Sequence, residues 1–545
     1  MKQISIERNW INRTYRGLSS ILGIVLMLGL LVSNVYGLTY NKFETSPSGS
    51  VGNWHNAANW SLGVLPTTNN YVSFKSAGIG VVTQVEEKVY SAFIGQSETS
   101  KLTVESNGGL STKAYFYVGY STGGTGTVIQ NGGDLNVGTS FKCGVLGGGF
   151  GVYTQMDGTV SCGDFSLGYD TGSTGSYTIV DGALDVRFPA GGYIGFGGDG
   201  TMNQVGGDVT LGKSFTLGKD ANATGIFNLS GGSLDIASQL ILGRNVDSTG
   251  IINQSGGTNT VKSIGNLYIS LYGTGEYNLT GGALHLKRDS SDYSIYIGHT
   301  GDGVLNMGDA SGSGSIDVVG SESGNISLVV RGSAAGASGV IHGWGGMHLP
   351  GAITMNGSVI ADGYGTDRTL WMTNSSRIAQ TLDNAVDDTN GWYAVDHGKL
   401  VLPTLPNVSA PGVYYWGEES DLDLVNSVKI QGYSGAGPIS GALLASDRTD
   451  VASNMLAVGV WEFSNPGAGS LSSVNLTFVF DHVKAAELGI AEADLKVYRY
   501  SGTKWIDVTT SIDTANNTIV ANSVGPYAHF AVGTSVVLGT IILVQ

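Results

Sequence analysis

The chain has 545 residues and is poor in cysteine, proline and charge. Its two cysteines, Cys143 and Cys162, are too few for a disulfide framework. Ten prolines do not make a proline-rich disordered chain. Only 13% of residues are charged, and 27 basic residues face 43 acidic ones, a formal net charge of -16. This balance argues against nucleic-acid binding, which needs clustered Lys and Arg to neutralise phosphates.

Glycine is abundant, with 86 residues, and it recurs at a fixed interval. A pair of glycines, or Asp-Gly, returns every 24 or 25 residues. Its second member stands at Gly109, Gly133, Gly158, Gly182, Gly207, Gly232, Gly257 and Gly282. A constant period in this range is typical of solenoids and propellers.

Each repeat contains three short segments in which apolar residues alternate with others. Examples are Phe116–Val118, the slot shared by Val128, Tyr153 and Tyr177, and the pair Leu135/Val137. Alternation of this kind predicts strands with one face turned inward, and stacked coils bury that face together. A propeller blade needs about 40 residues. The period therefore predicts a three-sided parallel β-helix.

The remaining sequence adds a signal and a second domain. Basic residues and the apolar run 18–32 predict an export signal cleaved after Gly37, an uncleaved anchor being the alternative. The mature chain contains no predicted membrane span.

The alternating run 474–480 and the hairpin pattern 495–508 predict a β-sandwich. The predicted divisions are a signal (1–37), cap and solenoid entry (38–100), regular coils (101–310), irregular coils (311–405), linker (406–411), β-sandwich (412–533) and apolar tail (534–545).

One position of the second strand carries asparagine in five coils. Side-chain amides stacked at one slot can hydrogen-bond along the ladder, so we interpret this set as structural. Its members are Asn203, Asn228, Asn253, Asn278 and Asn306.

Aromatic residues supply the candidate carbohydrate-binding sites. The outward slot of the first strand contains Tyr117, Tyr193, Tyr268 and Tyr296. Exposed rings can stack on sugars, although tyrosine also simply suits a strand surface. Trp54 and Trp60 are expected to pack in the cap, with sugar binding as the alternative.

Acidic residues of the irregular region supply the candidate metal site. Six acids lie near Arg368 and His397 and could form a site or bind Ca²⁺, with Asp362 and Asp367 as the candidate ligands; the alternative is that they are solvated or cap turns. The six are Asp362, Asp367, Asp383, Asp387, Asp388 and Asp396. No other cofactor is expected. His342 and His348, six residues apart, are a weak metal signal. The outward slots of the first and third strands do not align two acids on adjacent coils. No catalytic residue is therefore assigned, and an enzyme is disfavoured.

The Trp54–Pro66 entry, the glycine-pair coils and the segment 361–370 resemble secreted or surface β-helix proteins of bacteria. The resemblance is to autotransporter passengers, to pectin-lyase-like β-helices and to PEP-CTERM-associated proteins, although the PEP-CTERM tail and a translocator barrel are not seen. It implies an all-β fold, namely a right-handed three-sided parallel β-helix followed by a small antiparallel β-sandwich. It also implies a secreted, non-enzymatic structural or adhesive protein of the cell surface or matrix. The alternative is a polysaccharide-binding or polysaccharide-cleaving β-helix protein. Expected partners are polysaccharides, other surface proteins or, through exposed strand edges, further copies of the chain.

Overall fold

The computed structural model describes residues 38–535 with internal gaps. The gaps are 45–49, 75–77, 85–86, 188, 190, 263–264, 288–292, 320–325, 332–337, 350–352, 374–391, 403, 410–411, 418–423, 447–454 and 468. The predicted export signal and positions 536–545 of the predicted tail lie outside the described residues. Within the described part, no helix is long and apolar enough to cross a membrane.

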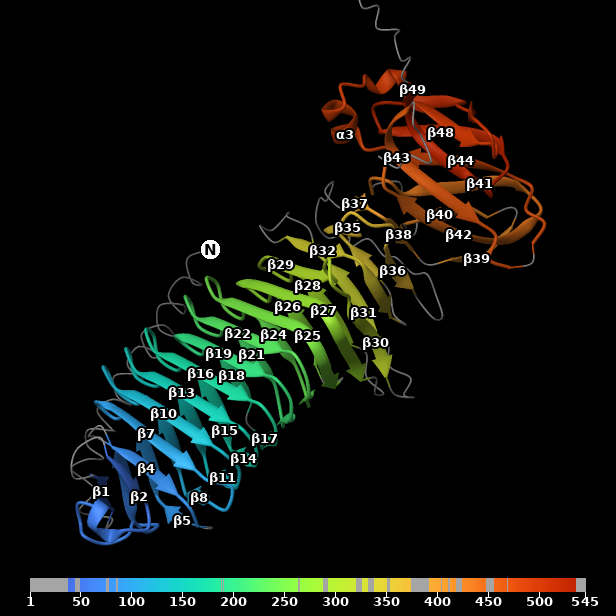
Figure 1. Cartoon of the computed structure of the whole chain (residues 1–545). Coiled ribbons are helices and arrows are strands. Elements are labelled where there is room, and N and C mark those ends of the chain that lie inside the picture. The colour runs from blue at the N-terminus through green and yellow to red at the C-terminus, as the bar shows by residue number, and fades with distance from the viewer. Residues whose placement is uncertain are drawn as a thin grey trace, which may run out of the picture.

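The chain folds as an elongated parallel β-solenoid with a smaller β-domain at its C-terminal end (Figure 1). Three strands form each coil, and each strand pairs in parallel with its counterpart one coil later, as β10 pairs with β13. The all-β prediction and the predicted parallel solenoid are confirmed.

The first ladder is a 13-stranded parallel sheet, which we call sheet A. Its strands are β1 (Thr39–Phe43), β3 (Asn70–Phe74), β6 (Ser91–Ile94), β9 (Tyr115–Val118), β12 (Ser140–Cys143), β15 (Asp164–Leu167), β18 (Gly192–Ile194), β21 (Phe215–Leu217), β24 (Leu240–Leu242), β26 (Leu267–Ile269), β28 (Tyr293–Ile297), β31 (Ile326–Val330) and β34 (Ile353–Met355).

The second ladder contains the asparagine slot. Its strands are β2 (Val51–Asn53), β4 (Ile79–Val82), β7 (Thr99–Val104), β10 (Thr125–Gln130), β13 (Phe150–Gln155), β16 (Thr174–Ile179), β19 (Asp199–Gln204), β22 (Thr224–Leu229), the first parts of β25 (Thr249–Lys262) and β27 (Thr274–Lys287), β29 (Gly303–Met307), β32 (Gly339–Gly343), β35 (Ser358–Asp362) and β37 (Trp392–His397).

The third ladder follows the glycine pairs. Its strands are β5 (Glu87–Val89), β8 (Gly109–Thr112), β11 (Asp134–Val137), β14 (Thr159–Cys162), β17 (Ala183–Val186), β20 (Asp208–Leu211), β23 (Ser233–Ile236), the second parts of β25 and β27, β30 (Ser315–Val319), β33 (Gly345–His348), β36 (Thr369–Thr373) and β38 (Lys399–Val401).

The predicted inward positions are buried and form one continuous core. The rings of Phe116, Phe141 and Phe165 stack along the axis with centroids 5.7 and 5.3 Å apart. Cys143 and Cys162 are buried free thiols, and burial raises the pKa of Cys143 to about 12. Stacking one coil on the next therefore removes apolar surface that a single coil would leave in water.

The core also contains buried glutamines, which the alternation alone did not reveal. Gln155 donates from Nε2 to the carbonyls of Gly158 (2.7 Å) and Ala183 (3.0 Å), and its Oε1 accepts a hydrogen bond from Tyr177 in the next coil (2.5 Å). The same arrangement joins Gln130 to Tyr153 and Gln254 to Tyr277. Each amide is thus satisfied inside the core, as a buried polar group requires.

Glycines between the first and second strands allow neighbouring coils to approach closely. Gly144 has a φ of +68°, and a Cβ atom there would lie 2.2 Å from the carbonyl oxygen of Thr174 in the next coil. Only glycine combines this left-handed backbone with the necessary space. The recurrent glycine is therefore required by the stacking of the coils.

The N-terminal end is closed by a compact loop. The solenoid already begins at β1, within the segment predicted as a cap. Trp54 and Trp60 are 0% and 3% exposed, pack edge to face, and flank the short 3₁₀ helix η1 (Ala57–Asn59). Backbone bonds from Glu44 to Asn59 and from Ser61 to Lys42 cover the outer edge of β1. Burial makes the two tryptophans part of the cap and removes them from contact with a sugar.

The C-terminal domain is an antiparallel sandwich, as predicted. One sheet has the order β40-β41-β44-β48-β47, and the other contains β42, β43, β49, β45 and β46. Trp461 on β43 and Phe478 on β44 pack between them with centroids 4.8 Å apart. The elements are β39 (Leu405–Ser409), β40 (Tyr414–Trp416), β41 (Val428–Ser434), β42 (Ala436–Leu444), β43 (Met455–Ser464), β44 (Ser473–Val479), α3 (His482–Glu487), η3 (Glu492–Asp494), β45 (Lys496–Tyr500), β46 (Trp505–Asp507), β47 (Ser511–Asp513), β48 (Thr518–Val524) and β49 (His529–Ser535).

The solenoid and the sandwich are hydrogen-bonded to each other. The last solenoid strand, β38, pairs antiparallel with β42, with Leu400 opposite Leu443. Strand β39, which occupies most of the predicted linker, also pairs with β42. The sandwich therefore covers the C-terminal end of the rod.

Candidate functional site

The asparagine slot forms a continuous chain of side-chain hydrogen bonds. Each Nδ2 donates to the Oδ1 of the asparagine one coil earlier, over 2.7–2.8 Å from Asn228 to Asn306. The first member, Asn203, donates to Thr178. These amides are engaged with one another, so the slot contributes to stacking and leaves little free hydrogen-bonding capacity for a ligand.

The tyrosines of the first strand do not form one stripe. Tyr117 and Tyr193 belong to a first group over the N-terminal strands of sheet A, in which Lys142 bridges two sets of contacting rings, while Tyr268 and Tyr296 form a separate pair. We call the first group the aromatic face; it comprises Tyr40, Tyr71, Phe93, Tyr117, Tyr120, Tyr169, Phe196 and Tyr193, with Lys142 and Lys219. It crosses the eight strands from β1 to β21, about 34 Å at the usual strand spacing.

Two lysines complete the aromatic face by lying over its rings. Lys142 Nζ is 3.1 Å from the ring centroid of Tyr169, and Lys219 Nζ is 3.4 Å from that of Phe196. Such cation–π contacts are favourable when the ammonium is partly desolvated. Burial lowers the pKa of Lys142 to about 8, against the opposing influence of Asp164 and Asp170. The face thus combines half-buried rings with two cations of reduced hydration.

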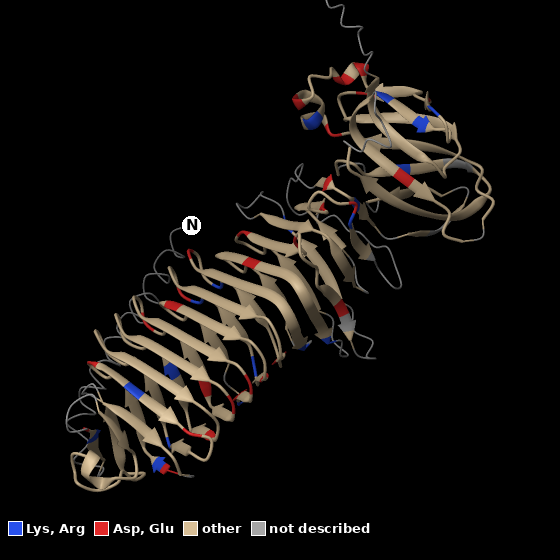
Figure 2. Cartoon of the chain, in the orientation of Figure 1, with Lys and Arg blue, Asp and Glu red and all other residues tan. Residues whose placement is uncertain are grey.

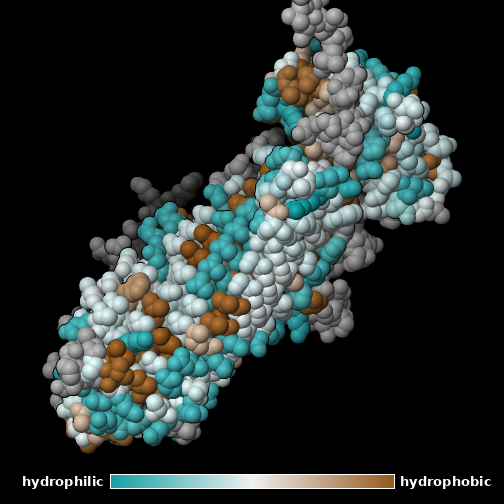
Figure 3. All heavy atoms as spheres, in the orientation of Figure 1, coloured by the Kyte–Doolittle hydropathy of each residue, from teal (hydrophilic) through white to brown (hydrophobic). Residues whose placement is uncertain are grey.

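The exposure of the aromatic face is uneven. Phe93 and Tyr117 are 6% and 9% exposed, whereas Tyr120, Tyr169, Tyr193 and Phe196 are half-buried. Burial raises the pKa of Tyr120 to about 12 and that of Tyr117 further, so both hydroxyls stay protonated at neutral pH. On the side visible in Figure 3, hydrophobic residues gather in separate patches with hydrophilic ones between them. Charged residues are sparse along the solenoid and are scattered over its strands and turns (Figure 2).

The second aromatic cluster lies further along sheet A. Tyr268 and Tyr296 stack with centroids 5.2 Å apart, and His299 packs edge-on against both. Thr216 and Ile241 occupy the intervening first-strand slots and separate this cluster from the aromatic face.

The position directly after the left-handed glycine of a coil supplies four members of the aromatic face. Tyr120, Tyr169, Phe196 and Lys219 all follow such a glycine, at Gly119, Gly168, Gly195 and Gly218. This slot repeats with the same period as the strands, so it was visible in the sequence. The alternation within the strands does not include this slot, so the strand pattern alone did not predict it.

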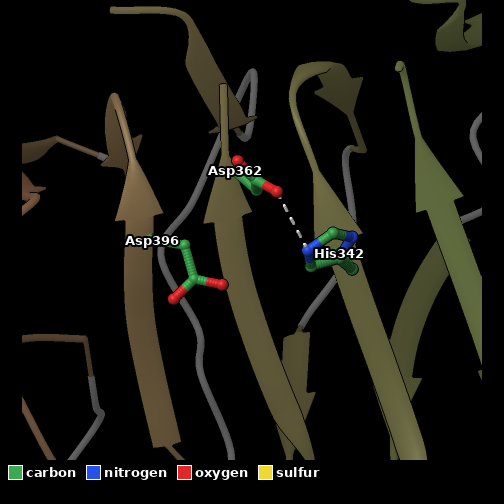
Figure 4. Close-up of side chains that lie close together, drawn as sticks. All are labelled: His342, Asp362 and Asp396. Carbon is green, nitrogen blue, oxygen red and sulfur yellow. Dashed lines mark ion pairs between the residues drawn. The ribbon is translucent and has the colours of Figure 1, made fainter. Parts of the chain in front are cut away.

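The second candidate is a His–Asp cluster at the C-terminal end of the second ladder (Figure 4). His342, Asp362 and Asp396 stand on the neighbouring strands β32, β35 and β37, and one ligand atom from each lies within 4.8 Å of the others. His342 Nε2 is 3.5 Å from Asp362 Oδ2, and His397 Nδ1 is 3.1 Å from Asp362 Oδ1. A β-bulge opposite Asp362 brings Asp396 and His397 to the same place.

The structure groups Asp362 with His342 rather than with Asp367. Asp367 is not in the three-residue cluster, and Arg368 lies over the ring of Trp344 while donating to the carbonyl oxygens of Asp309 and Ala310. His342 and His348 lie on different ladders. His342 stands opposite Asn306, in register with the asparagine slot, and this was the signal that could have identified it.

Comparisons of the chain with protein-family models, with curated proteins and with solved structures find no match. The β-solenoid is therefore established from the structure alone, and the likeness to autotransporter passengers and pectin lyases stays a prediction from the sequence.

Proposed function

We propose that the protein is a secreted structural or adhesive component of a bacterial cell surface or extracellular matrix, built as a stiff rod. The observation that carries this proposal is the continuous parallel stack of 13 strands in sheet A, together with the direct pairing of β38 with the terminal sandwich. Interlocked coils resist bending, because each strand is hydrogen-bonded to both neighbours. A rod of this kind holds its terminal domain at a distance from whatever retains the other end.

Support also comes from the distribution of the buried and exposed positions. The inward slots keep apolar residues or amides that are at least partly hydrogen-bonded from coil to coil, while the outward slot of the first strand changes from Tyr117 to Lys142 to Ser166. The regularity thus serves the stacking, and the outward slot varies from coil to coil. This pattern favours a scaffold over a conserved reaction centre repeated along the rod.

Localisation in the native cell tests this proposal. We expect the protein in the culture medium or on intact cells, where added protease removes it, and we expect its N-terminus at Leu38. A cytoplasmic marker protein should survive the same protease treatment. Recovery of the full chain from the cytoplasm with residues 1–37 intact would contradict the proposal.

A second candidate function is polysaccharide binding on the aromatic face. Its support is the two sets of contacting rings with Lys142 and Lys219 over them, because rings stack on the apolar faces of sugars while ammonium groups attract acidic sugars. The half-buried Tyr169 lies where Lys142 bridges the two sets of rings, in contact with Lys142 and Phe196.

Binding to a panel of neutral and acidic polysaccharides tests this candidate. We expect the wild-type chain to be retarded in gels containing an acidic polysaccharide and Tyr169→Ala to bind about tenfold more weakly. Tyr272→Ala is the matched control, because Tyr272 is 48% exposed and lies outside the aromatic face. Equal binding by both variants would remove the aromatic face from consideration. Release of sugar fragments during the assay would instead support the cleaving alternative.

A further inference from the structure

The His–Asp cluster differs from the rest of the second ladder in its chemistry. From Asn203 to Asn306 the slot holds amides that satisfy one another. In the next coil His342 takes this slot, and the following strands place Asp362 and Asp396 beside it. Two carboxylates and an imidazole thus replace a self-satisfied amide chain.

The carboxylate of Asp362 is held in one orientation. Its Oδ1 accepts hydrogen bonds from the backbone N–H of Tyr364 (2.7 Å) and meets His397 Nδ1 at 3.1 Å. Among the residues that the structure describes, Oδ2 accepts no hydrogen bond and faces His342 Nε2 at 3.5 Å. A metal-ligating carboxylate typically has this arrangement, with one oxygen fixed by outer groups and the other directed at the ion.

The distances fit the ligand set of a small cation. Ligands bound tetrahedrally at 2.0–2.2 Å lie roughly 3.3–3.6 Å from one another. The 3.5 Å between His342 and Asp362 falls within that range, and the third ligand, the exposed Asp396, lies within 4.8 Å and reaches it by a side-chain rotation. A cation would also relieve the repulsion between the two carboxylates.

We propose that His342, Asp362 and Asp396 bind a divalent transition-metal ion, with His397 as a positioning residue. One imidazole nitrogen and two carboxylate oxygens suit Zn²⁺ or Mn²⁺. Ca²⁺ requires six to eight oxygen ligands, which this trio does not supply. The bound ion links three successive strands, β32, β35 and β37, at the end of the rod where the asparagine chain stops. This proposal stands apart from the proposed scaffold function and does not depend on secretion.

Calorimetric titration of the chelator-treated full chain with Zn²⁺ alone tests the proposal. We expect one ion per chain, a higher thermal unfolding midpoint with Zn²⁺, and at least tenfold weaker binding by His342→Asn and by Asp362→Asn. His342→Asn suits the test, because asparagine is the residue at this slot in five preceding coils and the backbone can accept it. His348→Asn is the matched control and should bind as the wild type does.

Three further measurements separate the outcomes. His397→Gln should weaken binding by about 10–100-fold, the usual effect of removing a group that orients a ligand. Co²⁺ should give visible absorption bands that Zn²⁺ abolishes. Ca²⁺ at the same concentration should not displace Zn²⁺. Unchanged Zn²⁺ affinity in His342→Asn, or displacement of Zn²⁺ by equimolar Ca²⁺, would overturn the proposal.

Discussion

The coils within residues 101–310 and those between residues 315 and 401 use the same three ladders but fill them differently. In the first region the period is nearly constant, so like side chains meet in register and form the asparagine chain and the stacked phenylalanines. In the second region the interval changes, and strands bring unlike residues together, as in the cluster of His342, Asp362 and Asp396. Strict repetition thus places identical side chains on top of one another. Departures from the period bring different side chains together, so clusters of mixed residue types can form.

The largest expected difference concerns two left-handed glycines, one from each region. Gly144→Ala should destabilise the chain by about 3 kcal/mol or more, because the left-handed backbone is unfavourable for alanine and its Cβ would collide with Thr174. Gly365→Ala, in the irregular region, should cost only about 1–2 kcal/mol, because φ is also positive there (+75°) but no atom lies within 4 Å of the added Cβ. Urea unfolding of both variants measures the difference. Equal losses would show that the close approach of Thr174 adds nothing to the cost of the left-handed backbone.

A smaller effect is expected inside the regular coils. Tyr177→Phe removes the hydrogen bond to Gln155 Oε1 and leaves a buried carbonyl oxygen unpaired, which should cost about 1–3 kcal/mol. The control is Tyr193→Phe on the outer surface of sheet A, which should change the unfolding free energy by less than about 0.5 kcal/mol. If both variants unfold at the same urea concentration, the buried amides contribute nothing specific to the core.

The reverse substitution should stabilise the protein. Gln204 lacks the tyrosine partner, because Phe227 occupies the equivalent slot in the next coil, and its Oε1 is buried without a hydrogen bond. Phe227→Tyr should supply that bond and raise the unfolding free energy by about 0.5–1.5 kcal/mol. Phe215→Tyr, at an inward position of sheet A, is the control and should not stabilise. A loss of stability in Phe227→Tyr would show that the core lacks room for the hydroxyl.

The smallest expected effect concerns pH and Lys142. Burial lowers the pKa of this lysine to about 8 in the folded chain, below its ordinary value of 10.5. The unfolded chain therefore holds a proton that the folded chain has released between pH 8 and about 10.5, and the stability contributed by Lys142 rises with pH across that window. Between pH 7.5 and 9.5 we expect a gain of up to about 1 kcal/mol after allowing for solvent screening.

Lys142→Met should abolish that pH-dependent gain, whereas Lys101→Met, on the second ladder, should retain it. Urea unfolding at several pH values gives both slopes. An unchanged slope in Lys142→Met would mean that the lysine is better hydrated than its contact with Tyr169 implies.

Much of the fold could be predicted because a solenoid is governed by local periodicity. The glycine pairs, the three alternating segments and the asparagine slot each recur within one coil's length, and nearest-neighbour stacking converts recurrence directly into contact. The hairpin of β45 and β46 was also predicted from adjacent residues, and the structure confirms it. The buried glutamines were missed, because an apolar-or-polar pattern does not show that an amide can be satisfied by the next coil.

The candidate sites depended on contacts that no fixed spacing encodes. His342, Asp362 and Asp396 are separated by unequal intervals, and a β-bulge sets the last one, so their register could not be counted from the sequence. The same holds for the pairing of β38 with β42, which lie on either side of the predicted linker. The sequence by itself determined the repeating strands, their inward faces and the need for glycine at the turns, since these follow from backbone geometry and apolar burial within each coil. Only the tertiary structure decided which side chains meet across irregular coils and how the sandwich closes the rod, because those contacts depend on strand register over long separations.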